Sequence, residues 1–380
     1  AASDVYKRQL LSRHITPKIT GEHTASPDPT GQGGEVLVID TASMTVTNAI
    51  ILQHSDEPDF VDVSRGIPNY LGAPAILPDG LSAWVPSKQD NIMRGTLRDG
   101  KQLNHHNTLR AISSRIDLVA EAEDYPARVD HDNATMTSAA VAGYYGNYVF
   151  AALEGSRVVR VIDAYSGDAE INSFSVGRAP QGMVISPDGL TLFVHNFMDR
   201  TIRVHDVWPV VIENGPGADV NTVATYSTVS VETLSPDVLL GKQIFYDAAD
   251  RRLSRESYIS CAACHNDGGQ DGRVWDFTGF GEGLRNTIDL RGKPGSGLLH
   301  WSANFDEVQD FECQIRALAD GDGFLTADHC DSFSDPLGEP KAGLSVELDA
   351  LAAYVNSLDE LPVSPYRNGD GSLTAAAEAG

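Results

Sequence analysis

An internal repeat in the first part of the chain constrains its fold most strongly. An Ala-Pro pair, then Pro-Asp-Gly-Leu and a short apolar strand, occurs in residues 73–85 and again in residues 179–194. The later copy continues into a second strand that ends in Val-His-Asp206, and the same Val-x-Asp ending closes runs at Asp40 and Asp163. A repeating unit of about 40 residues built from short strands is typical of the blades of a β-propeller.

Strand-like runs separated by turns continue through residues 35–230. The clearest runs are residues 35–40, 148–153, 157–163, 192–195 and 201–206, with turns at 154–156 and 166–168. Such runs fit either a β-sandwich or a propeller, and the repeat decides in favour of the propeller. We therefore predict an all-β, partial propeller over residues 35–230, with about four blades and others expected upstream.

The opening of the chain does not look native. Its first nine residues, Ala-Ala-Ser-Asp-Val-Tyr-Lys-Arg-Gln, resemble a translated adapter remnant, and they contain no apolar core of a secretory signal. We expect residues 1–34 to be non-native or irregular, and the true N-terminus with its signal peptide to be missing.

The copy that begins at Ser186-Pro-Asp-Gly and ends at Asp206 resembles the YVTN-type propeller family. Between the two copies, residues 103–107 read Leu-Asn-His-His-Asn. Adjacent histidines can ligate a metal ion, but no Cys, Asp or Glu stands at a ligand spacing beside them. We predict a solvated loop there.

Residues 231–365 change from strands to helices. Ser235 followed by proline is a helix N-cap and start, and residues 345–358 carry apolar side chains at helical spacing. A helix, a cysteine motif, a long Gly-rich loop and a closing helix follow one another in the order of a cytochrome c-like module. The chain is thus predicted to be multidomain, with a mainly α, cytochrome c-like domain after the propeller.

The motif Cys261-Ala-Ala-Cys264-His265 lies in this second domain. In c-type haem sites two such thiols form thioethers to the porphyrin, and the adjoining imidazole binds the iron. A zinc site would need four ligands, and Cys313 and His329 fit no zinc-ribbon spacing; a thioredoxin-type motif would need a βαβ unit. We predict one haem c in this chain, on Cys261, Cys264 and His265, with His265 as the axial ligand of the iron.

Segments that follow the motif resemble the N-terminal haem domain of bacterial di-haem cytochrome c peroxidases and the MauG family. They are Asp-Gly-Arg at 271–273, Arg-Asn-Thr at 285–287, Leu-His-Trp at 299–301 and Glu-Val-Gln at 307–309. The resemblance implies a peroxidase acting on hydrogen peroxide, with Trp301 as an electron relay between two haems. It makes Gln309 the distal glutamine and Glu312 the preferred acid for O–O cleavage, with Glu307 as the alternative.

Other positions leave alternatives open. Phe280 stands where the family has a distal histidine, which implies an open iron face or a different ligand. Arg285 is expected to pair with a haem propionate. His300 could be a ligand, although a surface position is the favoured interpretation. Each of the three catalytic candidates could equally be a structural or solvated residue.

Leu-Ser-x5-Gly at residues 234–241 recurs as Leu-Thr-x5-Gly at residues 373–380. Because the first copy leads on to the cysteine motif, we predict that residues 366–380 begin a truncated second haem domain, with a second haem downstream. Calcium between the haem domains is a family feature that stays unplaced, since the Asp/Gly-rich residues 320–324 and 368–371 lack an EF-hand pattern and are expected to be turns.

The remaining cysteines, Cys313 and Cys330, are expected to form a disulfide, with two free thiols as the alternative. The net charge of −25 argues against nucleic acid and suits either solubility or a basic redox donor such as a small cytochrome. No apolar run is long enough to span a membrane. Since c-type haem is attached outside the cytoplasm, a periplasmic or cell-surface location is predicted. The alternatives to a peroxidase are an electron-transfer cytochrome with the propeller as a docking domain, and a propeller with a degenerate haem domain.

Overall fold

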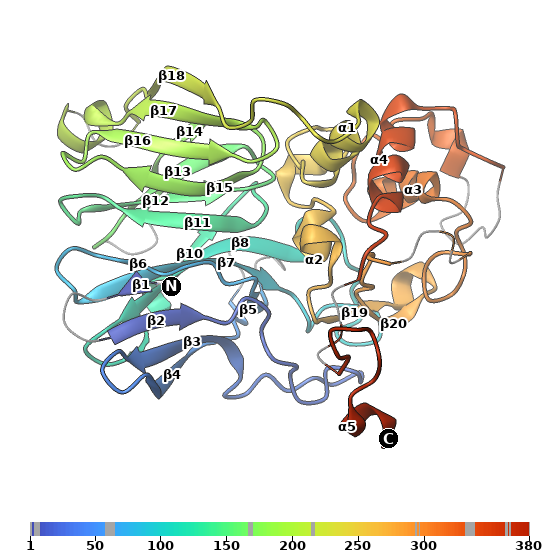
Figure 1. Cartoon of the computed structure of the whole chain (residues 1–380), viewed down its shortest axis with the longest axis horizontal. Coiled ribbons are helices and arrows are strands. Elements are labelled where there is room, and N and C mark those ends of the chain that lie inside the picture. Colours follow the sequence, from blue (N-terminus) through green and yellow to red (C-terminus); the bar gives the residue numbers. More distant parts are fainter. Residues whose placement is uncertain are drawn as a thin grey trace.

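The computed structural model describes residues 2–3, 8–57, 65–165, 170–213, 217–292, 295, 297–330, 339–361, 364 and 366–379. Four β-sheets lie side by side as a fan, and a mainly helical part packs against one edge of that fan (Figure 1). This arrangement confirms the predicted fold class, an all-β propeller part followed by a mainly α domain. The turn expected at 166–168 lies outside the described residues.

The first sheet contains β1 (Ala2–Ser3), β2 (Arg8–Ser12), β3 (Gly33–Asp40) and β4 (Thr45–Gln53). The second contains β5 (Ile67–Asn69), β6 (Ala75–Ile76), β7 (Ser82–Asp90), β8 (Leu109–Asp117), β9 (Ala122–Glu123) and β10 (Val129–His131). The third contains β11 (Thr137–Ala142), β12 (Tyr148–Leu153), β13 (Val158–Asp163) and β14 (Glu170–Ser175). The fourth contains β15 (Pro180–Ile185), β16 (Thr191–Asn196), β17 (Thr201–Asp206) and β18 (Asn221–Ser227).

The helical part contains α1 (Pro236–Phe245), α2 (Ala262–His265), α3 (Phe311–Ala317), α4 (Val346–Asn356) and α5 (Ala375–Glu378), with a hairpin of β19 (Val274–Phe277) and β20 (Gly283–Asn286). Short single-turn helices occupy Tyr125–Ala127, Pro209–Glu213, Arg255–Ser257, Asn266–Gly268, Thr278–Phe280, Val308–Asp310 and Ala327–Cys330. No helix among the described residues is long and apolar enough to cross a membrane.

The first, third and fourth sheets are antiparallel meanders in which the strands pair in chain order. In the second sheet β7 pairs with β5 and β8, β10 completes the edge, and the short β6 and β9 pair with β7 and β8. Strand β11 of the third sheet lies beside β7 of the second sheet and beside β15 of the fourth. Successive antiparallel sheets that pack side by side in this way are the arrangement of propeller blades.

Apolar side chains fill the layers between neighbouring sheets. The layer between the first and second sheets holds Leu10, Val36, Val38, Ile50, Leu52, Leu71, Ala83, Val85, Ile116 and Leu118. The next layer holds Leu77, Trp84, Val129, Val149, Ala151, Ile162 and Ala164, and the third holds Phe150, Ala152, Val159, Val161, Phe174, Leu192, Val194, Val207 and Val210. Since each buried side chain of this kind contributes about 1.5–3 kcal/mol, these layers hold the fan together.

The repeat has a local physical cause. Gly80 and Gly189 both adopt a left-handed backbone, with φ of 68° and 74°, which a β-carbon would strain. In each turn the preceding aspartate accepts a backbone N–H: Asp79 from Leu81 at 2.9 Å, and Asp188 from Leu190 at 3.1 Å. The Pro-Asp-Gly-Leu motif therefore builds the same turn before β7 and before β16.

The aspartates that end the repeat units cap the turns that follow them. Asp40, Asp163 and Asp206 each accept a backbone N–H two or three residues later, at 2.7–3.0 Å. Asp117 does the same at the end of β8, with the N–H of Val119 at 2.8 Å. This fourth copy escaped the sequence pattern because the residue two positions before it is Arg115 rather than valine.

The start of the chain differs from our expectation of an irregular segment. Arg8–Ser12 form β2, which pairs along its length with β3, and Leu10 is buried between the first two sheets. The first sheet thus begins upstream of residue 35. A single buried side chain in a five-residue strand gave too little alternation to be read as a strand.

The helical part is organised around the crossing of α1 and α4, which lie side by side in Figure 1. Both begin at a serine N-cap, as predicted: the hydroxyl of Ser235 accepts the N–H of Val238, and that of Ser345 the N–H of Leu348, both at 3.3 Å. At the crossing, a β-carbon on Gly241 would lie 1.8 Å from the carbonyl oxygen of Ala350. Glycine is needed there for the helices to approach this closely.

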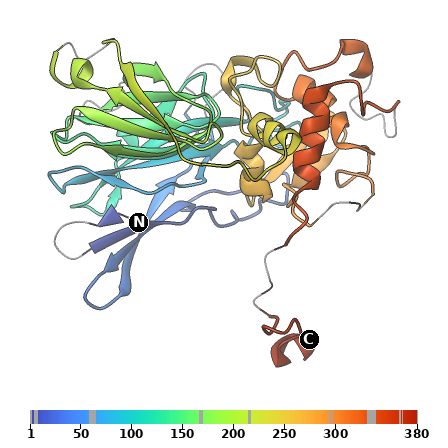
Figure 2. The same cartoon turned by 45° about the horizontal axis from the view of Figure 1, so that its top comes forward.

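The Leu-Thr-x5-Gly copy at residues 373–380, which repeats the motif at residues 234–241, also starts a helix. The hydroxyl of Thr374 accepts the N–H of Ala377 at 3.4 Å at the start of α5. Helix α5 lies apart from the other helices (Figure 2). Gly380, which completes the motif, lies outside the described residues, so the predicted second haem domain remains a prediction.

Candidate functional site

The cysteine motif lies between the propeller and the α1–α4 pair (Figure 1). Cys261 is the N-cap of the short helix α2, and Cys264 and His265 lie at its end. Neither thiol is in a disulfide, and both are half-buried. Two free sulfur atoms one helical turn apart are the donor set that two thioether bonds to one porphyrin require.

The imidazole of His265 is held in one tautomer. Its Nδ1 lies 2.9 Å from the carbonyl oxygen of Ile288 and 3.2 Å from that of Gly269, so Nδ1 carries the proton and donates. Burial lowers the pKa of this imidazole. The neutral ring therefore keeps Nε2 unprotonated, which is the state that binds a metal. The residues present fit a haem c.

Burial also keeps the unreacted thiols protonated. It raises the pKa of Cys261 to about 11 and raises that of Cys264. Cys264 packs with the buried Trp275 of β19, Phe280 and the propeller residue Leu103. Phe280, which stands in place of the family's distal histidine, is thus part of an apolar wall near the motif.

The propeller contributes directly to this site. The hydroxyl of Tyr70 donates to the carbonyl oxygen of Cys264 at 2.8 Å and accepts the N–H of Asn266 at 3.3 Å. His14 stacks on the Tyr70 ring with 4.7 Å between ring centroids. The backbone on both sides of His265 is therefore fixed by a side chain that lies 194 positions before Cys264 and 196 positions before Asn266 in the sequence.

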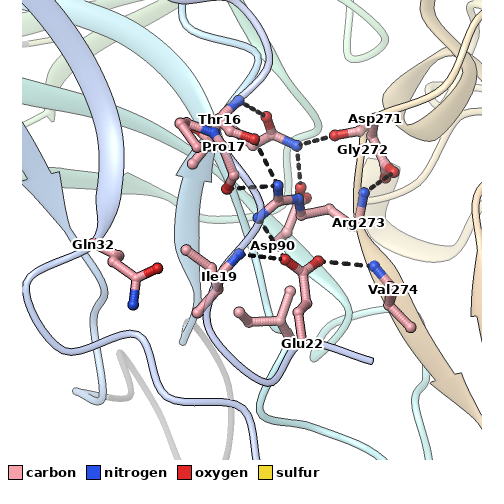
Figure 3. A network of polar contacts seen from close by, with 12 residues as sticks. Thr16, Pro17, Ile19, Glu22, Gln32, Asp90, Asp271, Gly272, Arg273 and Val274 are labelled. Atoms are coloured by element: carbon pink, nitrogen blue, oxygen red, sulfur yellow. Dashed lines mark hydrogen bonds and ion pairs between the residues drawn. The ribbon is translucent and has the colours of Figure 1, made fainter. Parts of the chain in front are cut away.

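A buried network of charged groups joins the two parts (Figure 3). The guanidinium of Arg273 donates to the carbonyl oxygens of Thr16 at 2.6 Å and Pro17 at 3.0 Å, and lies 3.3 Å from the carboxylate of Glu22. Glu22 in turn accepts the N–H of Val274 at 2.8 Å. Arg273 is fully buried and Glu22 nearly so, which makes the N-terminal segment part of the interface.

The expected solvated loop at residues 103–107 is also part of this interface. Leu103 is 1% exposed, and His105 and Asn107 are buried too. The two ring nitrogens of His105 lie 3.5 Å from Glu256 and 3.6 Å from Asp320 of the helical part. The prediction was wrong because the helical part, rather than water, covers this loop. No group of three metal-binding side chains was found among the described residues.

The structure gives the predicted acid residues other partners. Glu312 is fully buried in α3; its carboxylate accepts the N–H groups of Phe324 at 2.8 Å and Leu325 at 3.1 Å, and bonds Arg316 at 2.9 Å. The alternative acid, Glu307, caps the turn at Val308–Asp310. Both carboxylates thus hold backbone in place.

The other predicted site residues also bond to groups other than the imidazole of His265. The amide of Gln309 donates to Asp349 at 2.8 Å. Trp301 is 62% exposed and its Nε1 donates to the carbonyl oxygen of Asn286 at 2.8 Å. Arg285 lies in β20, half-buried, with Nε 3.5 Å from Glu282. Their roles toward a haem therefore remain proposals.

A cluster that the sequence did not predict joins the residue before β20 to the segment at residues 300–304. It consists of Glu282 and His300, which are 3.9 Å apart, with Ser302 donating to Glu282. The His300 ring bonds Asn304 at 2.8 Å and is largely buried, so the favoured surface position was wrong. Burial lowers the pKa of His265, and a charge on His300 would lower it further. We call Glu282 and His300 the Glu282–His300 pair.

A disulfide joins Cys313 in α3 to Cys330, as predicted. It closes the loop whose Asp/Gly-rich residues were weighed as calcium ligands. Asp320 and Asp322 of that loop pair with Arg255 at 2.8 Å and Arg251 at 3.3 Å. The loop closure is worth about 3 kcal/mol by loop length.

A buried carboxyl at the interface makes stability depend on pH. Glu154 is 2% exposed and accepts one bond, from Gln181 at 3.2 Å; burial raises its pKa from 4.5 to about 8. Above pH 4.5 the unfolded state loses a proton that the folded state keeps. The free energy of unfolding therefore falls as the pH rises from about 4.5 to about 8, by on the order of 5 kcal/mol. Glu154→Gln should remove this decline in denaturant unfolding measured across that range. The exposed control Glu360→Gln should keep it, and a Glu154→Gln profile parallel to that of the wild type would contradict the assignment.

Comparisons with known proteins include a match over the segment that contains the cysteine motif. Residues 235–315 match the di-haem cytochrome c peroxidase family, which confirms the resemblance predicted for this segment. A curated relative, the hydrazine synthase gamma subunit of Kuenenia stuttgartiensis, is 32% identical over 149 residues, 38% of this chain and 38% of that protein.

Solved structures similar to the chain include the Kuenenia stuttgartiensis hydrazine synthase, with 15% identity and a TM-score of 0.40 over 52% of this chain and 55% of that chain. They also include the Cps50 (Swd1) β-propeller domain of Myceliophteria thermophila, with 15% identity and a TM-score of 0.28 over 58% of this chain and 73% of that chain. The chain thus spans 38% of the curated relative and about half of the solved synthase chain.

Proposed function

We propose that this chain is a c-type haem oxidoreductase of the peroxidase type that acts on hydrogen peroxide. The haem is attached through Cys261 and Cys264, and His265 is the ligand of its iron. The proposal rests on one observation above others: His265 donates from Nδ1 to Ile288 at 2.9 Å, beside two thiols that are free. The family match over residues 235–315 supports the same chemistry.

The haem, when bound, supplies an iron centre that exchanges electrons and reduces peroxide. We assign the proton transfer that this requires to the Glu282–His300 pair. Its carboxylate and imidazole lie 3.9 Å apart, and general acid–base groups contribute about 10²- to 10⁴-fold to such reactions. Glu312 is the weaker candidate, because both of its oxygens already accept backbone N–H groups.

The other predicted residues keep proposed roles at the edge of the site. Trp301 is the proposed electron relay, since an exposed indole is accessible to a donor. Arg285 is proposed to pair with a haem propionate, and Gln309 to orient groups on the distal side. The donor we infer is a small redox protein such as a cytochrome, with a basic surface that suits the charge of −25.

A second candidate function is electron transfer without peroxide chemistry. The observation that favours it is that the His300 side chain is only 17% exposed and that its charge would lower the pKa of His265. A second imidazole bound to the iron would close the face that peroxide needs. In that case the propeller would serve as a docking domain for redox partners.

The visible spectrum of the haem-loaded chain, with and without hydrogen peroxide, tests the proposal. We expect a five-coordinate ferric spectrum that changes on addition of peroxide, and a rate of that change that falls about 10²-fold or more in Glu282→Gln. The exposed control Glu360→Gln should react as the wild type does. A six-coordinate spectrum that ignores peroxide, and that becomes five-coordinate in His300→Ala, would establish the electron-transfer alternative instead.

We further propose that the haem domain covers residues 231–365, that the propeller is of the YVTN type, and that residues 366–380 begin a second haem domain. A covalent haem and the Cys313–Cys330 disulfide both support a periplasmic or cell-surface location. Calcium stays without an assigned site.

A further inference from the structure

A fully buried ammonium group of the propeller lies at the contact with the haem domain. Lys88 of β7 is 0% exposed, and its Nζ lies 2.6 Å from Asp90 of the same strand and 3.7 Å from Asp271 of the haem domain. Asn69 of β5 donates to Asp90 at 2.8 Å and to the carbonyl oxygen of Asp271 at 2.9 Å. One cation and two carboxylates, contributed by both parts, are thus fully buried together.

This cluster is in contact with the groups that hold the cysteine motif. The Lys88 ammonium lies 4.6 Å from the centroid of the Tyr70 ring, whose hydroxyl bonds the Cys264 carbonyl at 2.8 Å. It also lies 5.9 Å from the ring of Trp275, whose Nε1 donates to Asp271 at 3.0 Å. A single aromatic ring separates the charge from the backbone of the attachment segment.

We propose that Lys88 is a positioning residue of the haem site, supplied by the propeller, whose charge raises the reduction potential of the haem. This inference rests on the proposed attachment of haem at Cys261 and Cys264. The ferric haem carries one more positive charge than the ferrous haem, so a nearby buried cation destabilises the ferric state more. Because these groups are fully buried, this field is weakly screened. Burial and hydrogen-bonded surroundings are among the means by which a protein sets a haem potential.

Charge variants of the cluster separate this effect from simple packing. Lys88→Met removes the cation, Asp90→Asn removes one carboxylate, and the double variant removes one of each and restores the original net charge. We expect the midpoint potential to fall in Lys88→Met, to rise in Asp90→Asn, and to return close to the wild-type value in the double variant. A role in packing alone would not produce shifts of opposite sign.

A matched control is Arg128→Met, which removes another buried cation of the same blade. Arg128 bonds Glu123 at 2.6 Å and the carbonyl oxygen of Gln53 at 2.7 Å, within the propeller. The haem midpoint potential of the Arg128→Met variant should equal that of the wild type. Potentials that do not follow the net charge of the cluster, or that shift equally in Arg128→Met, would overturn the proposal.

The haem content of each variant is measured first, from the absorbance of its denatured, pyridine-bound haem. Absence of covalent haem from the wild type would refute the proposed function. Full haem content with unchanged potentials would refute only the role of Lys88. If Lys88→Met does not fold, the other two variants still test the prediction. The midpoint potential of the double variant Lys88→Met/Asp90→Asn should match that of the wild type, and the midpoint potential of Asp90→Asn should be higher.

Discussion

Replacement of both Cys261 and Cys264 by alanine will leave the chain without covalently bound haem. Each thioether needs one of these sulfur atoms, and the only other cysteines of the sequence, Cys313 and Cys330, are joined to each other. The chain is expressed in cells that attach c-type haem. Covalent haem is then detected by its absorbance on a denaturing gel and by the mass of the intact protein, and both signals should be lost completely.

Two controls make this result specific. Cys313→Ser with Cys330→Ser removes the same number of sulfur atoms and should retain the haem signal. His265→Gln should keep covalent haem but change the spectrum of the ferrous protein, because the ligand and not the thioethers is altered. Covalent haem in the Cys261→Ala/Cys264→Ala variant would refute the assigned attachment site.

Arg273→Met will destabilise the folded chain by about 3–5 kcal/mol, because it leaves the carboxylate of Glu22 buried without its cation. Glu22 is 2% exposed and its ion pair with Arg273 spans 3.3 Å. The same change removes the bonds to Thr16 and Pro17 that hold the N-terminal segment (Figure 3). Denaturant unfolding, followed by far-ultraviolet circular dichroism, measures the loss.

The double variant Arg273→Met/Glu22→Gln should recover part of this loss, since no unpaired charge then remains buried. Arg13→Met is the matched control. Its partner Glu35 lies 2.9 Å away, but the Arg13 side chain is 55% exposed, and such pairs are worth about 1 kcal/mol or less. Equal losses for Arg273→Met and Arg13→Met would show that the buried network does not stabilise the interface.

The fold could be predicted from the sequence where its cause is local. Each of the turns at Gly80 and Gly189 needs an aspartate followed by a glycine in a left-handed conformation, so the same residues recur in each repeat. The caps at Ser235 and Ser345 act within one helical turn. The attachment motif is equally local, because two thiols and an imidazole must meet one porphyrin.

The rest of the site could not be predicted because its contacts join distant parts of the chain. Tyr70 directly follows β5 and Lys88 lies in β7, and no pattern near either residue points to a contact with a segment almost 200 positions later. Glu282 carried a weak local signal, an acidic residue between Gly281 and Gly283 in the loop where the family has its distal histidine. The sequence misled us about Glu312. Its position suggested a catalytic acid by resemblance, but its carboxylate accepts the N–H groups of residues 324–325.

The contact between Tyr70 and the attachment segment has a consequence for the order of events during biosynthesis. In the folded chain Ala262 and Ala263 are fully buried, and the Cys264 carbonyl is already bonded to the Tyr70 hydroxyl. If haem is attached at Cys261 and Cys264 as proposed, the enzyme that forms the two thioether bonds must reach a segment that the folded chain encloses. We therefore expect attachment to precede closure of the propeller against the helices, so that the last step of folding encloses the cofactor.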